Sequence, residues 1–150
     1  MTTEKIDVLV IGAGPSGTVA ASVINKAGFK VKIVEKEKFP RFVIGESLLP
    51  KCMEPLEAAG FLPVLKEQGY QEKFGAKFTD HQKRIMDFNF SDQFTKGWSW
   101  TWQVPRAHFD NVLSTEVQRM GVEVEFETAV TGIQFEGTNS TTTVIDKNGT

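Results

Sequence analysis

The chain has 150 residues, enough for a domain that buries roughly 70% of the surface its unfolded form exposes. It is 40% hydrophobic and 24% charged, as globular proteins are, and its net charge of −2 gives no reason to expect nucleic acid or an anionic membrane as a partner. The single cysteine, Cys52, cannot form an internal disulfide, which is typical of a reducing compartment. Without a signal peptide or an apolar run that could span a bilayer, the sequence predicts a cytoplasmic protein with no stable membrane insertion.

The first expected elements are an apolar strand over residues 6–11, the turn Gly12-Ala13-Gly14-Pro15-Ser16-Gly17 and a helix over residues 15–27. The turn has the G-x-G-x-x-G spacing of dinucleotide-binding proteins. Its first glycine allows the tight turn, Gly14 lets a pyrophosphate approach the backbone, and Gly17 lets the helix pack on the strand. Amide groups at the start of the helix also favour a phosphate. The alternative is a turn that merely connects a strand to a helix.

A second strand is expected over residues 31–34, and Glu35 follows it. Its distance from the turn is close to the ~20 residues expected for the acid that binds a ribose. A carboxylate here accepts a hydrogen bond from a 2′-hydroxyl and repels a 2′-phosphate, which argues against NADP. The neighbouring Lys36 and Lys38 weaken that argument.

A loop begins after Pro40 and ends in Gly45-Glu46-Ser47, before an expected helix over residues 48–59. Ser47 is a plausible N-cap for this helix, which is the structural interpretation of the small residues. The functional interpretation is that the Gly45–Ser47 loop lets backbone amides reach a flat cofactor ring. A short helix over residues 62–68 follows.

An antiparallel region at about residues 70–104 then interrupts the alternation of strands and helices. Apolar residues alternate with polar ones over residues 74–78, and a return strand follows at 85–90. A strand over residues 98–104 places three tryptophans on one face, where they could fill a core or stack on an aromatic ligand. We expect this insertion to carry a substrate-facing sheet.

The last expected elements are a helix over residues 106–120, a strand over 122–126, and a hairpin with strands at 128–136 and 141–146. Asn148-Gly149 is a further hairpin signal, so we expect the chain to be the first part of a longer protein. The pattern predicts an α/β fold: a Rossmann-like domain with an inserted antiparallel β region.

The residues that usually carry catalysis are few. The two histidines, His81 and His108, and the lone cysteine do not have the spacing of a zinc site, so no metal is expected. The sequence contains neither G-x-S-x-G nor the ending of a P-loop. A dinucleotide turn without an acid–base constellation indicates that a cofactor supplies the chemistry.

Four stretches together resemble FAD-dependent oxidoreductases of the geranylgeranyl reductase and flavin-dependent halogenase branch, which is related to the aromatic hydroxylases. The glycine turn with its acid resembles the half that binds adenosine diphosphate, and residues 40–50 resemble the second motif of this branch. Residues 104–113 resemble its arginine-led helix, and residues 121–130 resemble the strands that pass the adenine. The resemblance implies an FAD-binding domain and FAD as the cofactor. The family's Gly-Asp motif that closes the flavin site is missing, which again predicts an N-terminal part.

The resemblance also implies which residues contact the cofactor. They are Gly12, Gly14, Pro15, Ser16 and Gly17 at the pyrophosphate, Glu35 at the adenosine ribose with Lys36 beside it, Arg41 with Gly45, Glu46 and Ser47 along the ribityl chain and flavin ring, Arg106, and the backbone of Val130 at the adenine.

Two features resemble halogenases in particular. Phe74-Gly75-Ala76-Lys77-Phe78 resembles the segment that carries their essential lysine, with Lys77 in its place, and Trp100-Thr101-Trp102-Gln103-Val104-Pro105 resembles their W-x-W-x-I-P signature. The alternative for Lys77 is a solvated lysine on the polar face of a strand.

These resemblances imply an FAD-dependent oxidoreductase that acts through reduced flavin on a hydrophobic or aromatic small molecule. The flavin would be reduced by NAD(P)H, bound transiently, or by a separate flavin reductase. The alternatives are an isoprenoid double-bond reductase and a non-catalytic dinucleotide-binding sensor.

Overall fold

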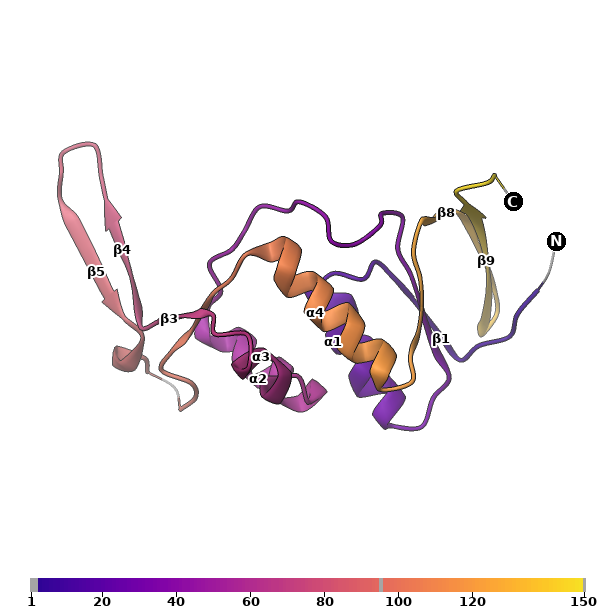
Figure 1. The fold of residues 1–150 in the computed structure, drawn as a ribbon, viewed down its shortest axis with the longest axis horizontal. Coiled ribbons are helices and arrows are strands. Elements are labelled where there is room, and N and C mark those ends of the chain that lie inside the picture. The colour runs from indigo at the N-terminus through magenta and orange to yellow at the C-terminus, as the bar shows by residue number, and fades with distance from the viewer. Residues whose placement is uncertain (1–2, 95, 150) are drawn as a thin grey trace. The chain divides into compact units, whose positions relative to one another are not determined.

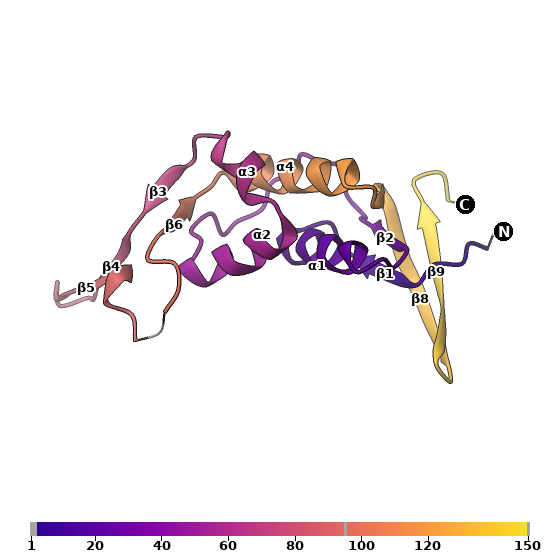
Figure 2. The same cartoon turned by 90° about the horizontal axis from the view of Figure 1, so that it is seen from below.

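The computed structural model describes residues 3–94 and 96–149, which divide into two compact units. We call residues 1–43 with 107–150 the parallel-sheet unit, and residues 44–106 the inserted unit. Figures 1 and 2 show their elements in two perpendicular views. Among the helices of the described ranges, none is long and apolar enough to cross a membrane.

Three parallel strands form the sheet of the parallel-sheet unit, in the order β1 (Val8–Ile11), β2 (Val31–Val34) and β7 (Glu123–Glu125). Helix α1 (Pro15–Lys26) connects β1 to β2, and helix α4 (Arg106–Arg119) precedes β7. The β1–α1–β2 unit and the parallel pairing are those expected for a Rossmann-like domain. The bounds of β2 agree with the predicted strand at every residue.

The core of this unit is formed by the apolar faces of β2 and α4. Ile33, Phe109, Leu113 and Val117 are at most 1% exposed. Helices α1 and α4 lie side by side in both views (Figures 1 and 2). Asn25 Nδ2 donates a hydrogen bond to the carbonyl of Met120 at 3.1 Å, which ties the end of α1 to the residue that follows α4.

The hairpin of strands β8 (Thr128–Glu136) and β9 (Asn139–Asp146) completes the parallel-sheet unit. Its strands are antiparallel, with a register shift between Val130 and Gly132. The predicted four-residue loop is shorter in the structure, because Asn139 and Ser140 already pair with β8.

The inserted unit consists of short helices and two separate antiparallel strand pairs, β3–β6 and β4–β5. Its elements are the 3₁₀ turn η1 (Pro50–Cys52), α2 (Met53–Ala59), α3 (Leu62–Lys66), β3 (Gln71–Lys73), β4 (Gly75–Thr79), β5 (Ile85–Asn89), the 3₁₀ turn η2 (Phe90–Asp92) and β6 (Thr101–Gln103). Its core contains Met53, Leu56, Phe61, Leu65, Trp102 and Val104.

The predicted N-cap at Ser47 is wrong. Ser47 pairs with Gln103, and the amide of Leu48 donates to the carbonyl of Trp102 at 3.3 Å, so residues 46–48 run antiparallel beside β6. Leu49 stays extended, with φ −114° and ψ 153°. The reason is that Leu49 precedes Pro50, and a residue directly before a proline disfavours the helical region. The helix therefore begins with η1, later than predicted.

The three tryptophans do not share one strand, since β6 contains Trp102 alone. Trp102 is 3% exposed and lies in the core, whereas Trp98 and Trp100 are half-buried. The rings stack edge to face in sequence, with centroids 5.5 Å apart for Trp98–Trp100 and 5.1 Å for Trp100–Trp102. The core interpretation is confirmed for Trp102.

Candidate functional site

The glycine turn joins β1 to α1 in a conformation that depends on its glycines. Gly12 has φ +102°, a region that side chains disfavour. A Cβ on Gly17 would lie 2.0 Å from the carbonyl oxygen of Gly12, so any side chain there would push the helix off the turn. The predicted reason for Gly17, close packing of helix on strand, is thus visible in the structure.

The start of α1 presents backbone amides. Gly14 is the N-cap and gives no side-chain cap, Pro15 has no N–H, and the first helical hydrogen bond is that from Thr18 N to Gly14 O at 3.0 Å. The amides of Ser16 and Gly17 come before Thr18 in the chain and therefore have no partner within the helix. Such amides at a helix N-terminus are well suited to a phosphate.

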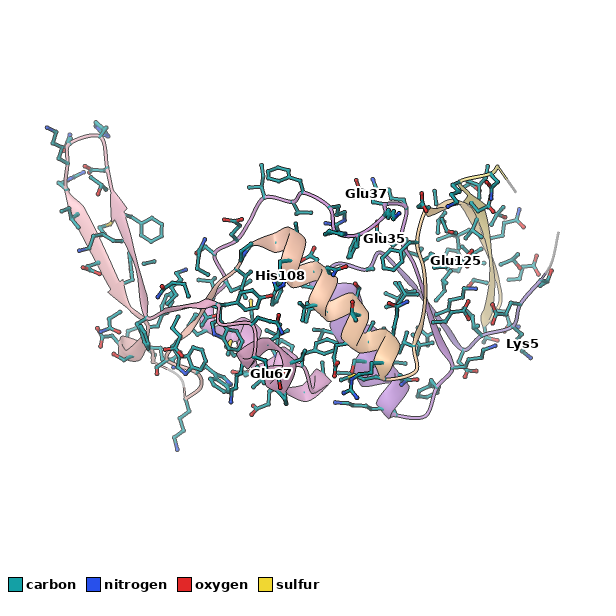
Figure 3. All side chains as sticks on the ribbon, viewed as in Figure 1. Lys5, Glu35, Glu37, Glu67, His108 and Glu125 are labelled. Atoms are coloured by element: carbon teal, nitrogen blue, oxygen red, sulfur yellow. The ribbon has the colours of Figure 1, made fainter. Side chains whose placement is uncertain are left out.

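Glu35 lies at the end of β2 with its carboxylate turned to the glycine turn. It is 5% exposed, and its Oε2 accepts from the amide of Ala13 at 2.8 Å while Oε1 accepts from the amide of Glu37 at 3.0 Å. The two oxygens together can accept about four hydrogen bonds, so acceptor capacity remains for a ribose hydroxyl. Figure 3 labels Glu35 and Glu37 in the segment that leaves β2. Lys36, between them, is exposed.

Arg41 also reaches the glycine turn. A Cβ on Gly14 would lie 3.8 Å from Arg41 Nη2. The guanidinium stacks on Phe39 at 4.5 Å and forms ion pairs with Glu37 and with Asp110 of α4, at 3.0 and 3.3 Å. The role of Asp110 was missed from the sequence, because 69 residues separate it from Arg41.

The Gly45–Ser47 loop lies in the inserted unit. Gly45 has φ +102°, and the carbonyls of Ile44 and Gly45 accept from Arg106 Nη1 at 3.4 and 3.3 Å. The carbonyl of Glu46 accepts from the amide of Val104 at 2.9 Å. The predicted site residues Gly45, Glu46, Ser47 and Arg106 therefore lie together.

The structure brings a different lysine from Lys77 to this loop. Lys73, the last residue of β3, donates from Nζ to Ser47 Oγ at 2.5 Å and to the carbonyl of Leu48 at 3.0 Å. Lys77 pairs instead with Asp87 across the β4–β5 hairpin, at 3.0 Å, and both side chains are more than 60% exposed. Lys73 precedes the alternating apolar stretch of β4, and this position was the signal that could have drawn attention to it.

Val130 lies in β8, opposite Val144 and next to the register shift. The start of β8 is fixed to the end of β2, since the amide of Thr128 donates to the carbonyl of Glu35 at 2.9 Å. Across the described part of the chain, no group of three or more histidine, cysteine, aspartate or glutamate residues could hold a metal ion.

The parallel-sheet unit thus fits the adenosine diphosphate part of a dinucleotide. Open backbone amides suit the pyrophosphate, the buried carboxylate of Glu35 suits the ribose, and the arginine at Gly14 adds a positive charge.

Comparison with known proteins agrees with this geometry. A curated relative, the flavin-dependent halogenase armH3 of Armillaria mellea, is 37% identical over 90% of this chain and 27% of its own length. A flavoprotein/dehydrogenase from Cytophaga hutchinsonii has a crystal structure with 68% identity and TM-score 0.92, over 98% of this chain and 36% of that one. The structure of the myxobacterial chondrochloren halogenase CndH has 32% identity and TM-score 0.87, over 99% of this chain and 35% of that one.

The chain therefore spans about a quarter to a third of the length of these proteins. Residues 5–150 match the family described as FAD binding domain. The predicted resemblance to FAD-dependent oxidoreductases and flavin-dependent halogenases is confirmed, and with it the α/β fold. This chain belongs to the FAD binding domain family.

Proposed function

We propose that the protein containing this chain is a flavin-dependent halogenase of an aromatic or hydrophobic small molecule. The observation that carries the proposal is Lys73, whose ammonium lies against the Gly45–Ser47 loop in a chain similar to two halogenases. The chemistry that reduced FAD supplies in such an enzyme is the activation of oxygen, which allows a halide to be oxidised to hypohalous acid.

A halogenase must then hold the hypohalous acid beside its substrate. Transfer of the halogen to an aromatic carbon displaces a proton, and the hydroxyl of the acid leaves as water. A lysine ammonium has three N–H donors and can polarise the acid by donating to its oxygen. Lys73 directs two donors to Ser47 Oγ and Leu48 O, and its ammonium also lies 5.1 Å from the ring centroid of Phe90, so its position is fixed. The ammonium has three N–H groups, and the one not donated to Ser47 or Leu48 is the donor that we assign to the small ligand.

Lys77 is the other candidate, on the resemblance of residues 74–78. Its strand is paired with β5 throughout, which makes it rigid, but its ammonium faces Asp87 on an exposed face. An exposed ion pair of this kind contributes little stability and leaves the ammonium strongly hydrated. The geometry favours Lys73, and the two lysines make different predictions.

The test is an assay of the full-length protein with FAD, a separate NADH-dependent flavin reductase, oxygen and bromide, offered indoles, phenols and pyrroles. We expect mass spectrometry to detect a brominated product. Lys73→Ala should abolish bromination while peroxide release persists, because the transfer step loses its donor. FAD binding should weaken only to the extent that the Gly45–Ser47 loop loses the hydrogen bonds from Lys73 to Ser47 and Leu48. Lys77→Ala is the matched control and should retain activity near that of the unmodified protein.

If Lys77→Ala abolishes bromination and Lys73→Ala does not, Lys77 is the lysine that holds the hypohalous acid. If the unmodified protein brominates no compound although it takes up FAD and consumes oxygen, the halogenase proposal fails and an isoprenoid reductase becomes the better candidate. If NADH alone sustains turnover, the separate reductase is unnecessary. A protein that shows no flavin absorbance after incubation with FAD would fit the non-catalytic sensor.

A further inference from the structure

A buried carboxylate in the parallel-sheet unit pairs with Arg41, the arginine that reaches the glycine turn. Asp110, in the first half of α4, is 1% exposed, and its Oδ2 lies 3.3 Å from Nη1 of Arg41. A carboxylate buried this deeply is destabilising unless it is paired, and when ionised it favours a cation beside it. None of the features attributed above to cofactor binding accounts for a charge at this position.

Arg41 is held from several sides and points one edge of its guanidinium at the turn. Asp110 contacts Nη1, Glu37 lies 3.0 Å from Nε, and the ring of Phe39 lies 4.5 Å from the guanidinium carbon. The remaining nitrogen, Nη2, is the atom that a Cβ on Gly14 would meet at 3.8 Å. The side chain of Arg41 is 15% exposed, so it is far from free to sample other positions.

We propose that Asp110 is a positioning residue for cofactor binding, and that it holds the Arg41 guanidinium at Gly14 for the FAD pyrophosphate. Arginine suits this task because its planar fork donates to phosphate oxygens in a fixed geometry. The inference rests on FAD binding, which the family provides, and does not depend on halogenation.

The direction in which one substitution changes the affinity for FAD separates this positioning role from a purely electrostatic effect. Asp110→Asn removes a negative charge near the place of a pyrophosphate and preserves the shape of the side chain. If Asp110 acted through its charge alone, the variant would bind FAD more tightly. If Asp110 positions Arg41, the variant binds FAD more weakly although the site has become more positive.

The experiment measures the Kd of FAD for the full-length apoprotein, by quenching of flavin fluorescence, for the unmodified protein, Asp110→Asn, Arg41→Gln and the double variant. We expect Asp110→Asn to raise the Kd roughly tenfold, and Arg41→Gln by at least as much. The double variant should bind FAD like Arg41→Gln, because an effect of Asp110 on FAD that acts through Arg41 disappears once Arg41 is replaced. Glu37→Gln is the matched control, since Glu37 also pairs with Arg41 but is 53% exposed, and it should change the Kd less than about threefold.

Each alternative outcome overturns the proposal. Tighter binding by Asp110→Asn means that charge alone operates. Equal losses for Asp110→Asn with and without Arg41 mean that Asp110 acts elsewhere. A lowered Tm with an unchanged Kd means that the ion pair is merely structural.

Should Asp110→Asn fail to fold, Arg41→Lys provides the second test. It keeps the charge on a partly exposed side chain but loses the planar fork. We expect it to raise the Kd nearly as much as Arg41→Gln. Binding like that of the unmodified protein would show that a positioned guanidinium is not needed.

Discussion

The glycine turn of the parallel-sheet unit and the β4–β5 hairpin of the inserted unit differ in how their side chains are covered. Around the turn, Glu35 and Asp110 are at most 5% exposed and are fixed by hydrogen bonds and ion pairs. The hairpin has one apolar face, formed by Phe74, Ala76, Phe78, Met86 and Phe88, and its four large side chains are 53–57% exposed.

This difference in burial decides for which region a binding role can be argued from the residues of this chain. The turn has its shape fixed by atoms of its own unit, so its binding role can be argued from these residues. The apolar hairpin face exposes rings that are ordinarily covered in a folded protein. Its alternating pattern places these apolar side chains on one face of the two strands, and within the described residues that face is half-exposed.

The largest expected effect is at Gly17. In Gly17→Ala the new Cβ would lie 2.0 Å from a backbone oxygen, so helix and turn must separate, and we expect a loss of more than about 3 kcal/mol together with loss of FAD binding. Gly132→Ala is the control, because nothing lies within 4 Å of its Cβ position, and it should stay within about 0.5 kcal/mol. Urea unfolding followed by circular dichroism measures both. Equal stabilities would mean that the turn tolerates a shift.

A pair of phenylalanines tests the contrast in burial. Phe109 is 1% exposed, and Phe109→Ala should cost about 3–5 kcal/mol because it leaves a cavity. Phe88 is 53% exposed and touches Phe78 edge to face at 5.7 Å, so Phe88→Ala should cost about 1 kcal/mol or less. The same unfolding measurement serves for both. If the two losses are equal in the full-length protein, the apolar hairpin face is covered there and the contrast disappears.

Glu35 tests the binding role of the turn. Glu35→Ala removes the acceptor expected to hold a ribose hydroxyl, and it leaves the buried amide of Ala13 without its 2.8 Å partner. A hydrogen bond to a charged group contributes about 1.5–3 kcal/mol, so the Kd for FAD should rise roughly tenfold to a hundredfold. Titration with FAD measures it. An unchanged Kd in a folded variant would show that Glu35 does not hold the cofactor.

The residues that could be predicted from the sequence are those whose signals are local. The sequence predicts every residue of strand β2 because a short apolar run ends at Glu35. It predicts the close packing at Gly17 because the glycine motif encodes a close backbone contact. The N-cap prediction for Ser47 is wrong because Ser47 pairs with Gln103, which lies far along the chain, and this pairing overrides a capping preference.

Long-range pairs also explain why Asp110 and Lys73 are not singled out by the sequence. Asp110 pairs with Arg41 and Lys73 with Ser47, at separations of 69 and 26 residues, and no local pattern predicts either pairing. Only the position of Lys73 before the alternating stretch of β4 marks that residue. Lys77 is a candidate because residues 74–78 resemble the halogenase segment with the essential lysine, and such a local resemblance does not predict that the Lys77 ammonium pairs with Asp87.

The smallest expected effect concerns charge, and it contrasts Lys32 of β2 with the exposed pair of the hairpin. The Lys32 side chain is 16% exposed, and its ammonium lies 2.8–3.0 Å from Glu4, Glu123 and Glu125. Burial acts to lower the pKa of Lys32, but hydrogen bonds to these carboxylates outweigh it, so the pKa is raised.

A raised pKa means that the folded state binds the proton more tightly than the unfolded state. The stability that Lys32 contributes is therefore fully present below the ordinary lysine pKa of about 10.4, and it is lost as the pH rises through the higher folded-state pKa. Lys32→Met should lower stability at pH 7 by about 1 kcal/mol or less, since the partners are partly exposed, and the gap to the unmodified protein should narrow above pH ~10.4. Urea unfolding at pH 7 and above pH ~10.4 measures the difference in stability between the variant and the unmodified protein. Lys77→Met is the control and should show almost no difference at either pH. A gap that stays constant with pH would mean that Lys32 contributes through the packing of its aliphatic stem and not through its charge.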